Sequence, residues 1–376
     1  MSQTALVPRR ADAARRAFAG RGRRPVRPGD TRAGLGFLTP FLAVYALFVV
    51  WPVVVALRMS GYDWDLLSAG REFIGFGNYR RMLWGTDMTW DVSHLLGWRL
   101  LILAATATYL VRAVRGSRVR VGTVLTALLG VLAFVVLGIH PGADGAWFDP
   151  GFWTSLQHTL EFTFISTPIL VVLGLLLAVA LSGKHRGASF YRAAFFLPYI
   201  LPVSAVTLIW SFLLNPDRGL VARGLGYFGV SPIGWLSDPN LAMWGIVLTS
   251  VWWSVGFNLV LFLAGVQDID PTLYEAAALD GANAWNRFLH VTVPGLRQVF
   301  LLVIVTQLIA SFQIFGQVYI MTRGGPGDST RVLIQHIYEA GFRDLEVGYA
   351  AAVSLFLFAV MAAVSAVQFR MMSKEA

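Results

Sequence analysis

The chain has 376 residues, of which 56% are hydrophobic and 14% are charged, and its mean hydropathy is +0.62. That much apolar surface, arranged in long unbroken runs, cannot be buried in a soluble core, so the composition predicts an all-α membrane protein with several spans and not a globular enzyme. Cysteine is absent, which excludes disulfides, thiolate metal sites and cysteine nucleophiles.

The net charge of +9 is concentrated in the basic tail formed by residues 1–34, which holds nine Arg and two Asp. Because the tail contains Pro and Gly and lacks apolar periodicity, we expect a disordered cytoplasmic end, with contact to anionic lipid as the alternative. Nucleic-acid binding is then a poor explanation of the charge. The next run, residues 35–57, is longer than the core of a signal peptide and has no convincing cleavage site behind it, so it predicts an uncleaved anchor.

Eight apolar runs have about the 20 residues that are needed to cross the hydrocarbon core. An even number of spans returns both termini to one side of the membrane. The segments on that side sum to a charge of +13 and the opposite loops to −4, so the positive-inside rule predicts that the N and C termini are cytoplasmic. The runs cover residues 35–57, 95–113, 121–140, 155–182, 191–214, 241–264, 296–321 and 347–370.

Away from the ends of these runs, two charged residues remain inside them, Arg99 in the second and Glu161 in the fourth. An ionised side chain at that depth is costly unless it is paired or close to the interface, so a structural ion pair between the two spans is one expectation. The alternative is that each side chain extends to the headgroups separately.

The loop at residues 265–297, between the sixth and seventh spans, predicts two short helices on the cytoplasmic side. Asp270 can cap the first helix, and Pro271 suits its opening position. Gly281 can end that helix with a positive φ, after which Asn283 can start the second. Two rigid elements would then project from the bilayer as one docking surface for a partner.

Four stretches of the chain resemble a known family of membrane proteins. The segment YEAAALDGANAWNRFLHVTVP resembles the EAA loop of permease subunits in binding-protein-dependent ABC importers. The stretches GFGNY, YRAAFFLPYILP and FGQVYIMTRGGPGDST resemble the carbohydrate-uptake branch of that family, which includes the maltose and glycerol-3-phosphate permeases. In chain order, the four stretches cover residues 75–79, 191–202, 274–294 and 315–330.

The resemblance covers residues 35–80 and 152–372, and members of the family commonly have a six-helix core. It therefore implies that residues 95–150 are an inserted two-helix hairpin, for which the sequence offers no function. The other divisions are the basic tail, a first span with its external loop at 35–94, and the permease core at 151–376. His158 stands where the family often has Asn, which is a departure from the family's pattern.

In the family, the EAA loop sits in a groove on an ATP-hydrolysing subunit and transmits its movement to the spans. The resemblance implies that small side chains in this loop permit close approach and that its carboxylates meet a basic partner. The alternative is that Glu275 is only solvated or stabilises a helix N-terminus. The residues to which the resemblance assigns coupling are Glu275, Ala276, Ala277, Asp280, Gly281 and Pro294.

A path for a sugar should be lined by hydrogen-bonding side chains and aromatic faces, and polar residues recur at helical spacing on the sixth and seventh spans. The alternative is that they only join neighbouring helices. The candidates for the substrate path are Ser250, Trp252, Ser254, Asn258, Thr306, Gln307, Ser311, Gln313 and Gln317, with Trp253 nearby.

The sequence has no G-x-x-x-x-G-K-[ST] phosphate-binding loop and no motif typical of a catalytic or metal site. We therefore expect no catalysis, metal or cofactor in this chain, with ATP and Mg bound by separate subunits. The resemblance implies a second, different permease, two ABC ATPases, an extracytoplasmic solute-binding protein and a carbohydrate substrate, in the bilayer of the bacterial inner membrane.

Two alternatives to a sugar permease remain open at this stage. One is an ABC permease for another solute, such as glycerol phosphate or an amino acid. The other is a self-sufficient secondary transporter or channel, although the scarcity of charged residues in the spans argues against a proton relay. The external turn at residues 324–326 either helps to receive the binding protein or is only a tight turn before the next helix.

Overall fold

The computed structural model describes ten ranges of the chain. Residues 1–27 of the basic tail and most of the predicted third span lie outside them, so the expectations for those segments stay predictions. The described ranges are 28–67, 70–84, 88–90, 96–115, 126, 130, 133–134, 139–141, 149–183 and 187–373.

The chain divides after Ala56 into two compact units, which we describe separately. The first contains α2 (Pro28–Tyr45) and the π-helical turn η1 (Ala46–Val50), and α3 (Trp51–Met59) crosses the division. The helix α2 begins inside the predicted disordered tail. Residues 36–54 are exposed and mostly apolar, as lipid-facing side chains are.

The second unit opens with small antiparallel strand pairs and two helices. Strand β1 (Tyr62–Trp64) pairs with β2 (Arg71–Phe73), and β3 (Met88–Trp90) pairs with β4 (Ile139–Pro141). The strand pair β1–β2 precedes α4 (Gly77–Trp84). The helix α5 (Leu96–Arg115) covers the second predicted span, which is therefore helical as expected.

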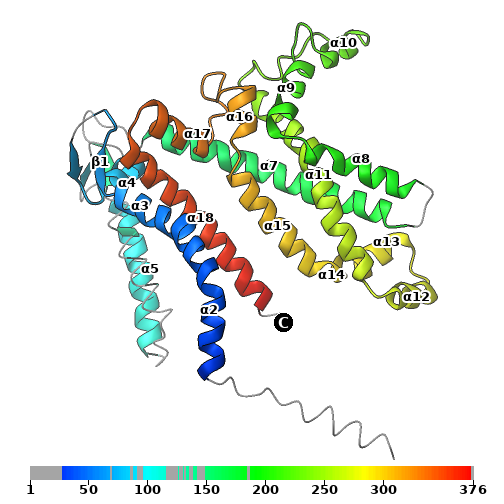
Figure 1. Cartoon of the computed structure of the whole chain (residues 1–376), viewed down its shortest axis with the longest axis horizontal. Helices are drawn as coiled ribbons and strands as arrows, with labels where there is room; N and C mark the ends of the chain where they lie inside the picture. Colours follow the sequence, from blue (N-terminus) through cyan, green and yellow to red (C-terminus); the bar gives the residue numbers. More distant parts are fainter. Residues whose placement is uncertain are drawn as a thin grey trace, which may run out of the picture. The chain divides into compact units, whose positions relative to one another are not determined.

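The centre of the second unit is formed by α7 (Pro150–Leu181) and α11 (Ala242–Asp268), which pack along each other (Figure 1). Asp149 fixes the start of α7, because its Oδ1 accepts hydrogen bonds from the backbone N–H groups of Gly151 (2.8 Å) and Phe152 (3.3 Å). Glycine permits the close helix contacts: a Cβ at Gly174 would lie 2.8 Å from Cβ of Asn258.

The fifth predicted span is not one continuous helix. It divides into α8 (Ala188–Ile200) and α9 (Val203–Leu213), which meet at an angle of 100°. Pro202 has no N–H group and holds the preceding Leu201 in an extended conformation (ψ 141°), so the helix cannot continue. A short helix, α10 (Leu220–Gly226), follows before α11.

The seventh predicted span, residues 296–321, is also interrupted. It contains α15 (Arg297–Phe312) and, after a non-helical break, α16 (Gly316–Met321). Phe315 has φ −146°, outside the helical region, and a Cβ at Gly316 would approach Val203 to 3.0 Å. The break thus lets α16 pack against α9.

The remaining elements surround these helices. Between α11 and α15 lie α12 (Pro271–Leu279), α13 (Ala284–Arg287), the π-helical turn η2 (Phe288–Thr292) and α14 (Val293–Gly295). After α16 come α17 (Leu333–Tyr338), the π-helical turn η3 (Glu339–Arg343) and α18 (Val347–Ser373). Buried apolar side chains join α4, α7, α17 and α18 in one cluster and α7, α11 and α15 in another.

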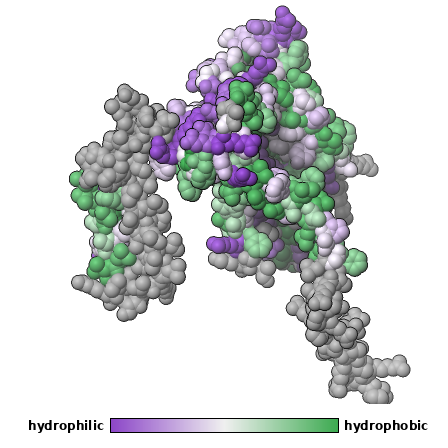
Figure 2. Space-filling view, turned by 60° about the vertical axis from the view of Figure 1, so that its left-hand side comes forward, coloured by the Kyte–Doolittle hydropathy of each residue, from purple (hydrophilic) through white to green (hydrophobic). Residues whose placement is uncertain are grey.

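Four described helices are long and apolar enough to cross a membrane, and the number rises to six if each of two sharply bent helix pairs is one span. Figure 2 shows hydrophobic residues over much of the visible surface, with hydrophilic residues mostly in its upper part. The structure is therefore that of a multi-pass membrane protein. The total of eight spans and the side of the termini stay predictions.

Candidate functional site

The loop between α11 and α15 forms the two short helices that the sequence predicts. Oδ1 of Asp270 accepts from the Thr272 backbone N–H (2.9 Å), and this hydrogen bond lowers the pKa of the Asp270 carboxyl. Oδ1 of Asn283 accepts in the same way from the Asn286 N–H (2.8 Å) at the start of α13. Gly281 lies between the helices with φ +77°, so the predicted caps and turn are confirmed.

This loop is held firmly to the helices on both sides. The hydroxyls of Tyr274 and Thr292 are 3.0 Å apart, and Tyr274 packs with Phe288 against the apolar cluster of α7, α11 and α15. A Cβ at Gly295 would approach Ile269 to 2.9 Å, which shows how closely the two ends of the loop meet. A force applied to the loop would therefore move α11 and α15 with it.

The exposed face of the loop is partly apolar, which the sequence analysis missed. Leu279 is 90% exposed and Trp285 is 62% exposed, with its ring stacked on Phe288 at 5.5 Å. The available signal was that Leu279 and Trp285 stand next to the polar turn residues Asp280 and Asn286 in the sequence. Of the residues assigned to coupling, Ala277 is half-buried, and the exposed ones are Glu275, Ala276, Asp280, Gly281 and Pro294.

A pocket of about 210 Å³, which we call the central pocket, lies where α7, α8, α11, α15 and α16 meet. It contains six of the nine residues predicted for a substrate path: Ser250, Ser254, Thr306, Gln307, Ser311 and Gln317. The rest of its lining is apolar or aromatic and comprises Phe162, Leu170, Tyr199, Trp253, Phe257, Ala310 and Ile314.

The polar side of the central pocket is cross-linked behind its surface. The amide of Asn258, which is fully buried, donates to Oε1 of Gln307 (3.2 Å) and so fixes the orientation of the glutamine. The hydroxyl of Ser311 lies 3.4 Å from that of Ser166 and 3.3 Å from that of Thr167 on α7. Asn258 is thus a supporting residue and does not line the pocket.

The aromatic side of the central pocket depends on the bend at Pro202. Tyr199 at the end of α8 stacks on Phe257 of α11, with ring centroids 4.9 Å apart. Nε1 of Trp253 donates to the Leu201 carbonyl (3.2 Å), which the end of α8 leaves available. Sequence spacing could not reveal Tyr199, which comes from another helix, whereas Phe257 follows Ser250 by seven residues and Ser254 by three and could have been found by spacing on α11.

Besides Asn258, two other predicted path residues lie outside the central pocket, so three of the nine do not line it. The Trp252 ring packs edge-on against Trp210 of α9, with centroids 5.6 Å apart. Gln313, in the break after α15, is exposed, and its amide lies 3.4 Å from the sulfur of Met361. The structure therefore separates them from the six residues that do line the pocket.

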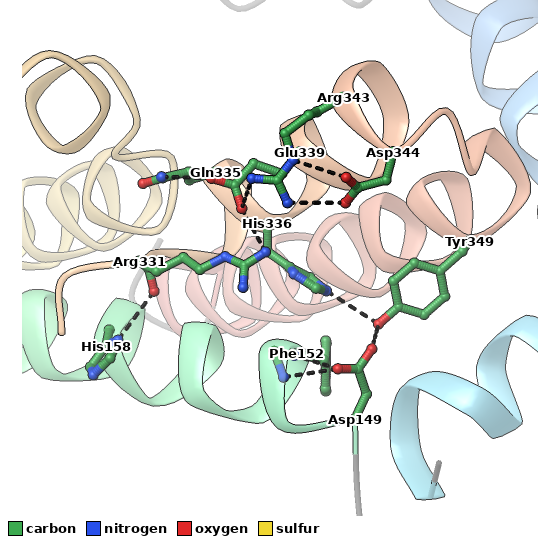
Figure 3. A network of polar contacts seen from close by, with 11 residues as sticks. Asp149, Phe152, His158, Arg331, Gln335, His336, Glu339, Arg343, Asp344 and Tyr349 are labelled. Atoms are coloured by element: carbon green, nitrogen blue, oxygen red, sulfur yellow. Dashed lines mark hydrogen bonds and ion pairs between the residues drawn. The ribbon is translucent and has the colours of Figure 1, made fainter. Parts of the chain in front are cut away.

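A buried polar network joins α7, α17 and α18 (Figure 3). The Tyr349 hydroxyl donates to Oδ2 of Asp149, so its oxygen is left to accept from Nε2 of His336 (3.2 Å). Burial lowers the pKa of His336, and the nearby Asp149 carboxylate only partly opposes this effect. Beside this group, Arg331 pairs with Glu339, and the Arg331 carbonyl lies 3.2 Å from Nδ1 of His158.

The segment at 324–326 is a tight turn, as one of the two sequence hypotheses expects. Gly324 has φ +87°, its carbonyl accepts from the Thr330 N–H (3.0 Å), and the Gly325–Pro326 peptide bond is cis. The hydroxyls of Thr322 and Thr330 close the turn at 2.8 Å. Its geometry is compatible with either hypothesis for its use.

The structure does not bring Arg99 and Glu161 together. Nε of the buried Arg99 donates to the Phe134 carbonyl (2.9 Å), and its guanidinium lies 4.2 Å from the centroid of the Phe134 ring. Glu161 is exposed on α7. The ion pairs between residues that the structure describes do not include one between these two side chains.

In the described ranges, no three His, Asp or Glu side chains are grouped so that they could hold a metal ion. Membrane-length helices around a polar pocket, with a rigid loop at one end, define a membrane transport component. The chain belongs to the family of binding-protein-dependent transport system inner membrane components, whose sequence profile matches residues 170–373.

The chain is similar to several curated members of this family. It is 37% identical to a lactose transport system permease protein of Rhizobium radiobacter over 59% of this chain and 76% of the relative. It is 35% identical to an sn-glycerol-3-phosphate transport system permease protein of Brucella abortus over 60% of this chain and 78% of the relative. These relatives are named as permeases, and the family to which the chain belongs consists of transport components.

A solved structure supports the fold. The crystal structure of a bacterial alginate ABC transporter in complex with a pentasaccharide-bound periplasmic protein contains a chain that is 21% identical, with a TM-score of 0.55. The match covers 59% of this chain and 78% of that chain. At this level of identity, the likeness concerns the arrangement of helices alone.

Proposed function

We propose that the chain is the permease subunit of an ATP-driven ABC importer and forms half of the path for a neutral sugar or oligosaccharide. The observation that carries this proposal is the position of the central pocket relative to the loop between α11 and α15, which we call the docking loop. The helix α15 is continuous from Arg297, next to the loop, to Phe312, beside the pocket, a length of about 24 Å. One rigid helix thus connects the loop on which a partner subunit would act with the central pocket, whose shape must change during transport.

The lining of the central pocket favours an uncharged substrate. Its polar groups are hydroxyls and amides, and its other side chains are apolar or aromatic. Among the described residues, no Asp, Glu, Lys or Arg lines this pocket. A phosphate or a zwitterion would have to leave water without a counter-charge, which is costly. Sugar hydroxyls, in contrast, can exchange bonds to water for bonds to these groups. This lining argues against glycerol phosphate or an amino acid.

The partners follow from what the chain does not carry. It has no phosphate-binding loop, so ATP and Mg belong to two ATPase subunits that dock on the loop between α11 and α15. A second permease, different from this chain, completes the path, and an extracytoplasmic binding protein delivers the sugar. The alginate transporter supports this arrangement, since it was crystallised with a periplasmic protein that holds an alginate pentasaccharide.

In the membrane of a bacterial cell, we place both termini and the docking loop on the cytoplasmic side, with eight spans in total. The inserted hairpin at residues 95–150 lies outside the six-helix core. Closure of the ATPases would move the loop through Glu275, Asp280 and the small residues around them. Because the loop is packed on α11 and α15, this motion would change the central pocket, as alternating access requires.

The test is sugar uptake and ATP hydrolysis by the complete importer in proteoliposomes, with lactose, maltotriose and arabinotriose as probes and glycerol 3-phosphate and glutamine as competitors. We expect stimulation by at least one neutral sugar and by neither competitor. Replacement of a pocket amide, Gln307→Ala, should lower uptake roughly tenfold, since a buried hydrogen-bonding group is lost. The matched control is Gln313→Ala, which lies outside the pocket and should be neutral.

Two results would contradict the proposal. Sugar uptake without any ATPase subunit would identify a secondary transporter or channel. Stimulation by glycerol 3-phosphate or glutamine alone would show that the uncharged lining does not select a sugar.

A further inference from the structure

A second pocket is formed by residues that follow Gln317, the last lining residue of the central pocket, in the sequence. It has a volume of about 490 Å³ and is built from α16, α17 and η3. This volume is within the usual range of ligand sites, about 300 to 1,000 Å³. We call it the tyrosine pocket, and it is lined by Tyr319, Arg323, Gln335, Tyr338, Glu339, Phe342 and Arg343.

Aromatic rings form one wall of the tyrosine pocket. Tyr319 and Tyr338 meet edge to face with centroids 5.3 Å apart, and Tyr338 stacks on Phe342 at 5.4 Å. A hydrogen bond with Tyr319 raises the pKa of the Tyr338 hydroxyl. Phe342 is 74% exposed, so the stack presents ring faces as well as hydroxyl groups to an incoming molecule.

The opposite side is polar and already held in place. The amide of Gln335 donates to Oε1 of Glu339 (2.9 Å), and Arg331 pairs with the other carboxylate oxygen from behind. Gln335 itself is 1% exposed, and its Oε1 has no hydrogen-bond partner among the described residues. Arg343 is bound to Asp344 through two N–H groups (2.9 and 3.2 Å).

These two sides together suit a carbohydrate. Flat aromatic faces cover the apolar C–H face of a sugar ring, while planar amide, carboxylate and guanidinium groups offer paired donors and acceptors to neighbouring hydroxyls. Two guanidinium groups, Arg323 and Arg343, stand beside the Glu339 carboxylate in the lining, so the preference for a neutral sugar comes from the uncharged lining of the central pocket and not from this pocket. A purely apolar partner would leave the same polar groups without water or hydrogen bonds.

The position of the pocket indicates when a sugar would use it. Gln317 of α16 lines the central pocket, and Tyr319, two residues further on, lines the tyrosine pocket. The short helix α16 is therefore a wall shared by the two. The charge distribution places residues 322–346 on the outer side, so the tyrosine pocket comes first for a sugar that enters from outside.

We propose that the tyrosine pocket is a second carbohydrate site, at the outer mouth of the path, which holds a neutral sugar between its release from the binding protein and its arrival in the central pocket. This inference rests on the proposed function. Loss of the site should let released sugar escape outward after ATP has been spent, so the ratio of sugar imported to ATP hydrolysed should fall.

The experiment measures this ratio in the complete importer in proteoliposomes with lactose, maltotriose and arabinotriose. Phe342→Ala, which removes an exposed ring, should lower the ratio by roughly five- to tenfold, while hydrolysis stimulated by the loaded binding protein persists. Phe342→Tyr keeps the aromatic face and should retain the ratio. Tyr227→Ala is the matched control, because Tyr227 is 91% exposed but does not line the pocket.

Each other outcome overturns the inference. If uptake and hydrolysis fall together at a constant ratio, the rings contact the binding protein or the partner permease and not the sugar. If Phe342→Ala and Tyr338→Ala both leave the ratio unchanged, the pocket is not on the path. If the wild-type importer responds to no sugar, the proposed function has failed first, and this inference fails with it.

Discussion

At the scale of single residues, His336 shows how the structure holds a titratable group neutral. It is buried between α7 and α18 and lies near Asp149, Arg331, Glu339 and Arg81. The ion pairs that the described residues form do not include His336. Burial lowers its pKa, because the charged imidazolium would lose its hydration. The Tyr349 hydroxyl is the acceptor for its ring N–H and is itself fixed by Asp149.

This arrangement predicts a pH dependence of stability. Because the pKa of His336 is lower in the folded chain than its ordinary value of 6.5, the unfolded chain binds the proton more strongly. Stability should therefore be complete above about pH 6.5 and should decrease as the pH falls below it, down to the folded pKa. The measurement is the thermal unfolding midpoint of the importer in nanodiscs from about pH 5 to about pH 8.

The variant His336→Gln keeps a donor for Tyr349 and cannot titrate, so its unfolding midpoint should depend less on pH. His290→Gln serves as the control, since His290 is exposed on η2 and its replacement should leave the wild-type slope unchanged. An unaltered slope in His336→Gln would show that another group causes the pH dependence.

At the scale of elements, the contact between α8 and α11 depends on Gly256. A Cβ at this position would lie 2.0 Å from the Phe195 carbonyl oxygen and 2.8 Å from Cα of Phe196. Both are backbone atoms, which cannot move aside as the end of a flexible side chain can. The packing of α8, and with it the position of Tyr199 in the central pocket, thus requires glycine.

We therefore expect Gly256→Ala to destabilise the folded chain by about 1 to 3 kcal/mol, because overpacking forces the two helices apart. Its unfolding midpoint in nanodiscs and its sugar affinity should both decrease. Gly224→Ala is the comparison, since a Cβ there meets no atom within 4 Å. Equal midpoints for the two variants would contradict the close contact.

The same elements show which features of the fold the sequence pattern could not predict. Apolar runs located α7, α11 and α18 well, because each is one continuous helix. They did not reveal that Pro202 turns α9 by 100° from α8 or that the seventh run breaks at Phe315, since side chains remain apolar on both sides of each interruption. Pro202 was a visible signal, whereas no proline marks the break at Phe315, beside which Gly316 packs against Val203 of α9.

At the scale of the whole molecule, local chemistry was more predictable than assembled sites. The caps of the docking loop followed from Asp270 and Asn283, because capping depends on neighbours in the sequence. Helical spacing found the polar side of the central pocket on α11 and α15. It could not find Tyr199, which reaches the pocket only through the fold, and it included Gln313, whose helix ends one residue earlier.

The docking loop leads to a prediction about the whole assembly. Leu279 and Trp285 are exposed apolar side chains on a loop that packs firmly against α11 and α15, so we expect both to be buried by an ATPase subunit. Burial of such a side chain contributes about 1.5 to 3 kcal/mol, so Leu279→Ser should weaken ATPase association roughly tenfold or more. Trp285→Ala should act in the same direction.

Association is measured by co-purification of the ATPase with the permease pair, and coupling by the hydrolysis that the loaded binding protein stimulates. Leu220→Ser provides the matched control, because Leu220 is exposed on α10, in the segment between α9 and α11, and is expected to face the outside. It should alter neither quantity.

If Leu279→Ser and Trp285→Ala retained full association, the apolar face would not be the contact, and the carboxylates Glu275 and Asp280 would have to carry it. Their replacement by Ala would then have to abolish the association that the apolar variants retain.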